Sequence, residues 1–347
     1  MTDQIVARLD EFADIQRELE TILQTLVLND STIIDALAQM LGAIQQVQLR
    51  AEKAQTRLEE KCAVVAKEMQ GFALAVTHLD AERRQSPIVV SGDAQSETDP
   101  EIALLEYLQP FLDDATAIDV GANRGTVSER LLKSGYRVCA FEPFEASFQS
   151  LSKRLADYKD FRAFQIAIGD ADGRRPLHVA EALTENSGHD PSLYHTLVPH
   201  PMPDRVRFGD TVEVSVRSLD SLRAEGLVPE RVGALKIDTE GTDLAVIRGL
   251  GLLTPSVIVT EFWDGRHIFG QSGHGQLSET AGALLERGYY WYVVMYRPDD
   301  TGAISYYFNR SDTPANSWGN AVFFQDHALF AKAARWCEAV LNPTFFR

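Results

Sequence analysis

The chain has 347 residues, of which 24% are charged and 45% hydrophobic, and its formal net charge is −17. A chain of this length can bury one sizeable core and carry an accessory region. The acidic balance argues against a nucleic-acid backbone or an anionic lipid surface as a partner, since there is no basic stripe to neutralise phosphates.

Cysteine usage and hydropathy indicate a reducing compartment. Cys62, Cys139 and Cys337 are too few and too scattered for a disulfide framework, and no Cys/His cluster has zinc-ligand spacing. No apolar run approaches the ~18–20 residues of a spanning helix. The first residues also lack the basic and apolar regions of a secretory signal. We therefore expect a cytoplasmic protein with no integral membrane segment.

Residues 1–84 predict a long α-helical coiled coil. They contain no proline and only two glycines. Apolar residues recur with gaps of three and four, the coiled-coil pattern, in the series Ile44, Val47, Ala51, Ala54, Leu58, Cys62, Val65, Met69, Phe72, Val76 and Leu79. Residues 29–31, Asn-Asp-Ser, are either a helix break with a new N-cap or a discontinuity in one helix. We expect homo-oligomerisation through this region; folding back of its first segment is the alternative.

A linker and a second domain follow the coiled coil. Residues 85–98 contain Pro87, Gly92 and several small polar residues, and are predicted to be the linker. Asp99 and Pro100 have the pattern of an N-cap followed by proline at the first helical position, which predicts a helix over residues 101–108. The second domain is expected to cover residues 99–347.

Apolar runs alternate with helical patterns beyond residue 115, which predicts an α/β fold with a doubly wound, mostly parallel sheet. The expected strands cover residues 115–118, 136–141, 161–168, 232–237 and 256–260, with a helix over 126–133. Each strand leads into an acidic residue, in chain order Asp119, Glu142, Asp170, Asp238 and Glu261. Because ligands bind outside the carboxyl ends of such strands, these carboxylates are expected to converge at one edge.

A long insertion is predicted on the substrate side of the sheet. A turn and strand over residues 171–180 and a strand over 211–217 enclose residues 181–210, which carry four prolines and the histidines His189, His195 and His200. Loops of this length in compact domains are usually functional or disordered. Helices over 276–287 and 327–341 and closing strands over 289–296 and 320–324 complete the prediction.

The most informative motif is Asp-Val-Gly-Ala-Asn-Arg-Gly at residues 119–125, between an expected strand and an expected helix. Glycines let the backbone approach a ligand and adopt positive φ, and the helix start offers unpaired N–H groups. The spacing differs from Gly-x-Gly-x-x-Gly, which weakens the dinucleotide interpretation. Glu142 stands where α/β nucleotide folds bind ribose hydroxyls. Together these residues indicate a nucleotide-cofactor site.

Four phrases resemble the FkbM-type methyltransferases, which belong to the class I, S-adenosylmethionine-dependent methyltransferases. They are Ile-Asp-Val-Gly-Ala-Asn-Arg-Gly at 118–125, Ala-Phe-Glu-Pro at 140–143, Lys-Ile-Asp-Thr-Glu-Gly at 236–241 and Val-Thr-Glu at 259–261. The resemblance runs from about residue 100 to about residue 325, and the third phrase is much more specific than the glycine turn. The family usually continues Glu-Gly-x-Glu, whereas here the last position is Asp243, a shorter carboxylate.

The resemblance implies a Rossmann-like class I fold and S-adenosyl-L-methionine as cofactor. Asp119 would lie near the ammonium group of the cofactor, and Glu142 would accept both ribose hydroxyls. Ala167 and Ile168 would flank the adenine. The residues of the glycine turn would pass under the methionine moiety: Gly121, Ala122, Asn123 and Gly125.

Three residues are candidates for catalysis. Asp238, which is also expected to contact the cofactor, either removes the acceptor proton or holds the acceptor. Glu261 at the next strand end is a second candidate, and His195 in the insertion could supply a base near neutral pH. Lys236 lies on the same side of its strand as Asp238, and is interpreted as the partner in a structural ion pair.

The strand-end carboxylates could instead bind a divalent cation, because hard oxygen ligands suit magnesium. The residues concerned are Asp238, Glu240, Asp243 and Glu261. Their spacing does not demand a metal, and we expect none.

Taken together, the sequence predicts an S-adenosylmethionine-dependent O-methyltransferase. The resemblance implies a hydroxyl acceptor on a saccharide or a polyketide-like natural product. A glycan is favoured because a rod that clusters catalytic domains suits a polymeric substrate through multivalency. Two alternatives stay open. One is a coiled-coil scaffold with a catalytically silent methyltransferase-like domain. The other is a nicotinamide-dependent oxidoreductase, which fits Glu142 but not the glycine turn.

Overall fold

The computed structural model describes residues 99–183, 190–199, 206–272, 275–297 and 304–343, together with eight separate positions between residues 42 and 61. The chain divides into two compact units, Met1–Asp80 and Ala81–Arg347. The described positions of the first unit are helical: Gly42, Ile44, Gln46, Leu49, Arg50, Lys53, Thr56 and Lys61. The rest of the expected coiled coil and the linker over 85–98 lie outside the described residues, so both stay predictions.

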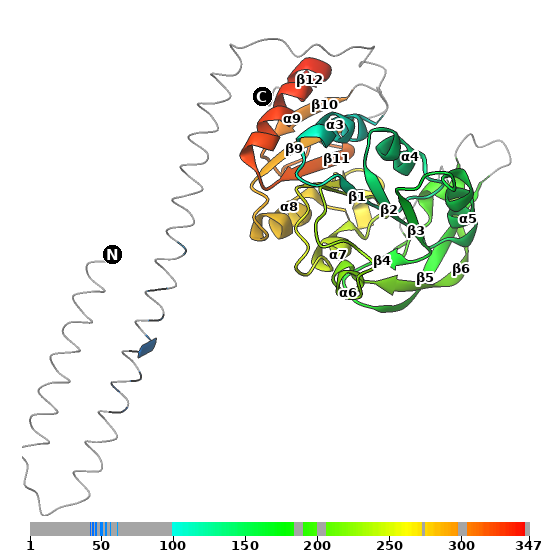
Figure 1. Ribbon diagram of the computed structural model, residues 1–347, viewed down its shortest axis with the longest axis horizontal. Helices are drawn as coiled ribbons and strands as arrows, with labels where there is room; N and C mark the ends of the chain where they lie inside the picture. The colour runs from blue at the N-terminus through cyan, green and yellow to red at the C-terminus, as the bar shows by residue number, and fades with distance from the viewer. Residues whose placement is uncertain are drawn as a thin grey trace, which may run out of the picture. The chain divides into compact units, whose positions relative to one another are not determined.

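The second unit is built on a large mixed sheet (Figure 1). Its described strands are β1 (Thr116–Val120), β2 (Arg137–Phe141), β3 (Phe161–Phe164), β7 (Ala234–Ile237), β8 (Val257–Trp263), β9 (Trp291–Arg297), β10 (Ser305–Phe308), β11 (Trp318–Phe324) and β12 (Asn342–Pro343). They are ordered β12-β10-β9-β11-β8-β7-β1-β2-β3. The strands from β8 to β3 pair in parallel, whereas β11, β9 and β10 pair antiparallel. The predicted α/β class and mostly parallel sheet are confirmed.

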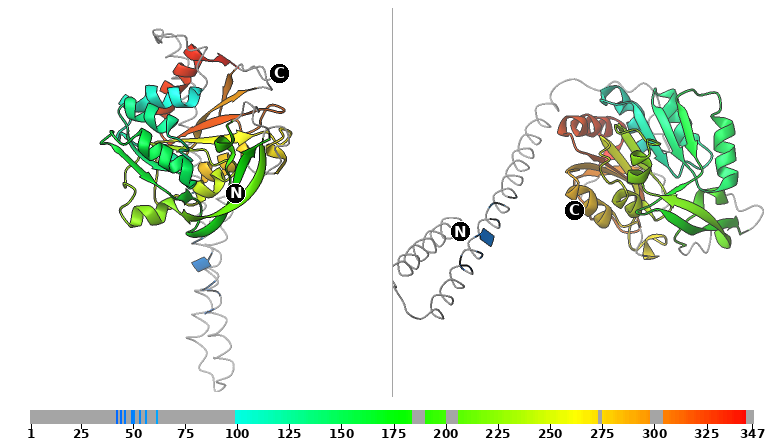
Figure 2. Two further views of the ribbon diagram at one scale, coloured as in Figure 1. Left: turned by 90° about the vertical axis from the view of Figure 1, so that its right-hand side faces the viewer. Right: turned by 60° about the horizontal axis from the view of Figure 1, so that its bottom comes forward.

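Helices cover both faces of this sheet (Figures 1 and 2). On one face, α3 (Pro100–Leu108) contacts α4 (Thr126–Lys133) and α9 (His327–Val340), with α5 (Glu145–Arg154) beside α4. On the other face, α6 (Leu219–Ala224), α7 (Asp243–Arg248) and α8 (Leu277–Glu286) share one apolar core with β1, β7 and β8. Alternation along β1 sends Ile118 and Val120 into that core and turns Asp119 toward α4.

A second, small sheet departs from the sequence prediction. Its described strands are β4 (Ala167–Ile168), β5 (Gly173–Ala182) and β6 (Val206–Arg217), in the order β4-β6-β5. The single strand expected over residues 161–168 is wrong: Phe164 pairs with Phe141 of β2, whereas Ala167 pairs with Val216 of β6. An apolar run that is continuous in sequence thus serves two sheets, because its two halves meet different partner strands.

The insertion predicted over residues 181–210 is shorter than expected. Glu181 and Ala182 extend β5, and β6 begins at Val206, opposite Ala182. Between these strands, η3 (Pro191–Tyr194) forms one helical turn; residues 184–189 and 200–205 lie outside the described part of the chain. The ends of this long hairpin were missed because Gly209 and nearby prolines interrupt the strand pattern.

The remaining elements agree with the prediction more closely. The helices expected over 101–108, 126–133, 276–287 and 327–341 appear as α3, α4, α8 and α9, and the closing strands as β9 and β11. The short strands β10 and β12 and the 3-10 turns η2 (Gln109–Phe111) and η4 (Gly270–Ser272) were not predicted. Within the described part of the chain, no helix is both long enough and apolar enough to cross a bilayer.

Asp243, the position at which the chain departs from the family pattern, ties the ends of β7 and β8 together. Its buried Oδ1 accepts hydrogen bonds from the backbone N and Oγ1 of Thr239, at 3.0 and 2.5 Å. Its Oδ2 accepts from Thr260 Oγ1 at 3.0 Å and from the backbone N of Glu261 at 2.9 Å. This carboxylate therefore fixes the geometry of two strand ends.

We expect Asp243→Asn to destabilise the domain by about 2–3 kcal/mol, because its amide NH₂ must face at least one N–H or O–H donor and leaves buried groups unpaired. Urea unfolding measures the loss. Asp113→Asn is the matched control, since Asp113 is exposed. Equal stabilities of the two variants would contradict the structural role of Asp243.

Candidate active site

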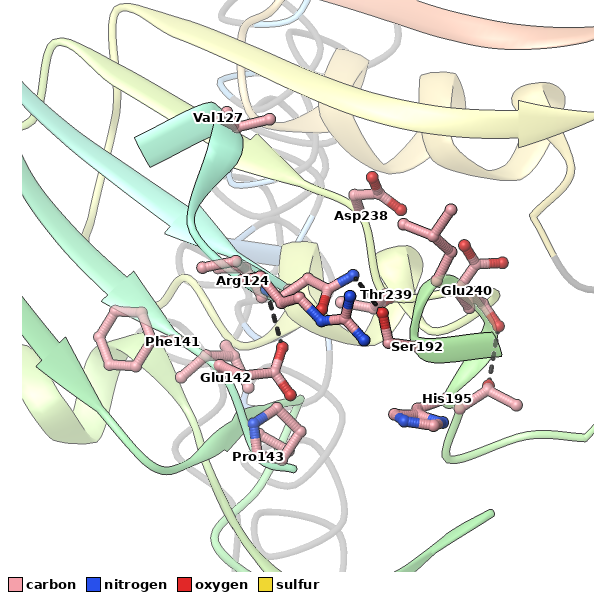
Figure 3. Close-up of a pocket in the computed structure, with 18 of the residues that line it drawn as sticks. Arg124, Val127, Phe141, Glu142, Pro143, Ser192, His195, Asp238, Thr239 and Glu240 are labelled. Atoms are coloured by element: carbon pink, nitrogen blue, oxygen red, sulfur yellow. Dashed lines mark hydrogen bonds between the residues drawn. The ribbon is translucent and has the colours of Figure 1, made fainter. Parts of the chain in front are cut away.

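A cavity of about 410 Å³ lies at the carboxyl ends of β1, β2 and β7 (Figure 3). Its wall is contributed by the turn after β1, the end of β2, the approach to β4, the end of β7 and residues 190–199, which we call the strap. The lining includes Gly121, Ala122, Asn123, Arg124, Phe141, Glu142, Pro143, Ile166, Ala167, Ile168, Leu193, His195, Lys236, Asp238, Thr239 and Glu240. Most of the residues predicted from the sequence are thus brought together here.

Close packing explains the glycines of the turn. Gly121 has φ of 78°, and a Cβ there would lie 1.8 Å from the carbonyl oxygen of Asp238. Gly125 has φ of 85° and is the N-cap of α4; its Cβ would lie 2.6 Å from Leu151 Cδ1. Gly121 lines the cavity but Gly125 does not. Gly125 therefore serves the packing of α4 against α5 rather than the cavity wall.

Glu142 is held by the backbone of the glycine turn. Its Oε2 accepts a hydrogen bond from the backbone N of Asn123 at 2.9 Å, and its Oε1 accepts from that of Phe144 at 2.8 Å. Burial raises the pKa of Glu142 to about 7, against these two N–H groups, which favour the charged form. Each carboxylate oxygen can accept a further hydrogen bond, so the group suits a diol in the cavity.

Asp119 lies behind the turn and does not line the cavity. It is fully buried, and its Oδ2 accepts a hydrogen bond from Ser128 Oγ at 2.6 Å. Its Oδ1 lies 3.7 Å from Lys236 Nζ and accepts no hydrogen bond from any residue that the structure describes. A buried carboxylate oxygen without a donor favours a cationic group nearby.

Lys236 lines the cavity and is paired, as the sequence suggested. Its Nζ lies 3.0 Å from Asp238 Oδ2. Burial acts to lower the pKa of Lys236, but the carboxylates of Asp238 and Asp119 outweigh it and raise that pKa above its ordinary value. The ammonium group is therefore charged at neutral pH.

Three carboxylates lie close together near the carboxyl ends of β7 and β8. Asp238, Glu240 and Glu261 each place an oxygen within 4.8 Å of the others. Burial, followed by the charges of Glu240, Asp238 and Asp243, raises the pKa of Glu261 well above its usual range. Glu261 does not itself line the cavity. Asp243, considered with them as a cation ligand, already accepts the hydrogen bonds that join the ends of β7 and β8.

The strap is fastened to both sides of the cavity. Arg124 forms a bidentate ion pair with Asp190, in which the two nitrogen–oxygen distances are 2.7 and 3.3 Å. Asn123 Nδ2 donates to Ser192 Oγ at 3.3 Å, and Thr196 Oγ1 donates to the carbonyl of Glu240 at 2.8 Å. These contacts were not predicted from the sequence, although Asp190-Pro191 has the N-cap and N1 pattern that predicts the helical turn.

His195 lies in the cavity wall, but one ring nitrogen is already used. Its Nδ1 accepts a hydrogen bond from the backbone N of Ala180 at 3.1 Å, and its ring meets Phe144 edge-on at 4.3 Å. Burial lowers the pKa of His195. A neutral ring that accepts at Nδ1 carries its hydrogen on Nε2, which suits donation to a ligand better than removal of a proton. His189 and His200 lie outside the described residues.

Two groups of predicted residues are not in the site. Asp170 is exposed and does not line the cavity, because the chain leaves the main sheet after Phe164. Trp263 and Tyr194, aromatic residues close to the site in sequence, are buried in an apolar cluster with Phe269. Their burial makes them core residues.

Comparison with known proteins agrees with this geometry. The family model described as "Methyltransferase FkbM domain" matches residues 119–289. Over 151 residues the chain is 29% identical to "Methyltransferase 1" of Beauveria bassiana (strain ARSEF 2860), covering 41% of this chain and 60% of the relative. Over 156 residues it is 31% identical to "Methyltransferase sdnD" of Sordaria araneosa, covering 38% and 59%. The chain spans about 60% of the length of these curated relatives.

Solved methyltransferases resemble the chain loosely. The 1,6-didemethyltoxoflavin-N1-methyltransferase of Burkholderia thailandensis, with S-adenosylhomocysteine bound, is 13% identical with a TM-score of 0.34, covering 77% of this chain and 90% of that one. Precorrin-6y C5,15-methyltransferase from Geobacter metallireducens GS-15 is 12% identical with a TM-score of 0.31, covering 64% and 86%.

The chain contains a methyltransferase domain of the FkbM type, and the resemblance inferred from its four sequence phrases is confirmed over residues 119–289.

The close approach at Gly121 gives a stability test. We expect Gly121→Ala to lower the free energy of unfolding by at least about 2 kcal/mol more than Gly226→Ala, because overpacking against backbone adds to the positive-φ penalty. Gly226 is the matched control: its φ is 72° and a Cβ there meets nothing within 4 Å. Chemical denaturation of both variants measures the difference, and equal losses would contradict the steric explanation.

Proposed function

We propose that the protein is an S-adenosyl-L-methionine-dependent O-methyltransferase acting on a hydroxyl of a saccharide or glycan. The observation that carries the proposal is the pairing of Glu142 with the backbone of the glycine turn at one cavity. In a methyltransferase domain, this arrangement presents a carboxylate to the ribose of the cofactor.

The residues at the cavity fit the chemistry of this cofactor. Glu142 can accept both ribose hydroxyls, whereas Asp119, buried behind the turn, would favour the ammonium group of the methionine moiety through its charge rather than by contact. Ala167 and Ile168 offer an apolar surface to adenine. Gly121, Ala122 and Asn123 offer backbone. When bound, the cofactor supplies an electrophilic methyl group on its sulfonium.

The carboxylates of the acceptor end would handle the proton. Methyl transfer to a hydroxyl gives a methyl ether, S-adenosylhomocysteine and one proton, which a base should remove as the new bond forms. Asp238 lies in the cavity and can accept a hydrogen bond from the hydroxyl of the acceptor. Glu261 lies beside Asp238 and its own pKa is raised, so it suits storage of the proton. His195 would donate from Nε2 to orient the acceptor.

The polar acceptor end supports a saccharide, because carboxylates accept hydrogen bonds from several hydroxyls at once. Homo-oligomerisation through residues 1–84 and a cytoplasmic location belong to the same proposal, with no nucleic acid as partner. The homo-oligomer would bring several catalytic domains to one glycan chain.

Calorimetry with S-adenosylhomocysteine tests the cofactor, with NADH as the control ligand. We expect micromolar or tighter binding of S-adenosylhomocysteine and none of NADH, since the glycine turn lacks the dinucleotide spacing. Incubation with methyl-labelled S-adenosylmethionine and hydroxylated glycans should then give label in an alkali-stable methyl ether. Binding of NADH alone would favour the oxidoreductase, and label recovered only on nitrogen would contradict O-methylation.

The ionisation of Glu142 should appear in the pH dependence of cofactor affinity. The diol donates to a carboxylate better than to a carboxylic acid, so the affinity should fall as the pH drops through about 7. One linked proton weakens S-adenosylhomocysteine binding about tenfold between pH 8 and pH 6. Glu142→Gln should bind more weakly with little pH dependence over this range. An unchanged affinity in Glu142→Gln would remove the residue from the ribose site.

A further inference from the structure

Lys236 links a carboxylate in the cavity wall to a carboxylate that is buried behind the wall. Its register partner in β1 is Asp119, and its side chain lies on the same side of β7 as that of Asp238. The Nζ atom stands 3.0 Å from Asp238 Oδ2 and 3.7 Å from Asp119 Oδ1. The side chain is only 7% exposed, yet it lines the cavity. One buried positive charge thus lies between the Asp119 carboxylate behind the turn and the Asp238 carboxylate in the cavity wall.

Structural pairing alone does not account for this position. Leu235 and Ile237, on either side, are fully buried in the apolar core. Their side chains point to the other face of β7; burying an ammonium group on the remaining face of so apolar a strand is unfavourable, and apolar replacements of buried ion pairs are often neutral or stabilising. Asp119 and Asp238 instead keep a lysine charged beside the cavity.

We propose that Lys236 sets the preference of the cavity between the cationic donor and the neutral product. This inference rests on the proposed function. S-adenosylmethionine differs from S-adenosylhomocysteine by one methyl group and one positive charge. The carboxylates of Asp119, Asp238 and Glu240 attract that charge, and the ammonium group of Lys236 offsets part of the attraction.

The offset matters for the reaction. During transfer the methyl group leaves sulfur for oxygen, the electron pair of the broken carbon–sulfur bond stays on sulfur, and the sulfonium charge disappears. A site that bound only the sulfonium form tightly would stabilise the ground state more than the transition state. Lys236 limits that ground-state stabilisation while the carboxylates remain available to the acceptor hydroxyl.

Calorimetry with both forms of the cofactor, without an acceptor, tests the inference. The quantity is the ratio of the Kd of S-adenosylhomocysteine to the Kd of S-adenosylmethionine. We expect Lys236→Met to raise this ratio about three- to tenfold, because loss of a nearby unit charge favours the cation. Asp238→Asn should lower the ratio. Lys236→Arg keeps the charge and should leave the ratio near that of the wild-type protein.

Lys159→Met is the matched control, since Lys159 is exposed and does not line the cavity. A purely structural role of Lys236 would weaken both ligands equally, and an unchanged ratio in Lys236→Met would overturn the inference. If that variant fails to fold, the variant Lys236→Met/Asp238→Asn is compared with Asp238→Asn, and the ratio must again rise. A wild-type protein that binds neither ligand would overturn the proposed function and this inference together.

Discussion

The placement of one ammonium group among buried carboxylates is the constraint on which the site depends. Parallel pairing of β1 with β7 sets Asp119 opposite Lys236, and alternation along β7 sets Lys236 beside Asp238. Ser128 extends these contacts from Asp119 to α4. A buried carboxylate without this network would be strongly unfavourable. The strand register, the position of α4 and the charge balance of the cavity therefore all depend on the same set of contacts.

The two sides of the cavity are held by interactions of different strength. On the sheet side, Glu142 and Asp243 are bound by backbone N–H groups and buried hydroxyls, which favour one geometry strongly. On the strap side, Arg124 and Asp190 are 52% and 38% exposed, so their ion pair adds only about 0–1 kcal/mol. The wall around Glu142 is thus preorganised by the sheet, whereas the wall formed by the strap is held mainly by exposed contacts.

Much of this site could be predicted from the sequence, because local signals determine it. The glycine turn, Glu142 and the strand-end residue Asp238 follow from strand, turn and helix patterns read over short windows. The split between Phe164 and Ala167 could not be read in that way, since only the partner strands β2 and β6 decide it. The hydrogen bonds of Asp243 likewise depend on Thr260 and Glu261, which belong to another strand.

The carboxylates that the sequence grouped together show why residue type alone does not determine a role. Asp170 stands in solvent, and Asp119 is buried behind the turn. Burial raises the pKa of Glu142 to about 7 and raises that of Glu261 well above its usual range, whereas Asp238 is paired with an ammonium group. Environments that separate the ionisation of neighbouring acids would allow the proposed site to hold a cation at one end and accept a proton at the other. The fold supplies those environments through strand register and burial, and the same residues in a different register would be interchangeable acids.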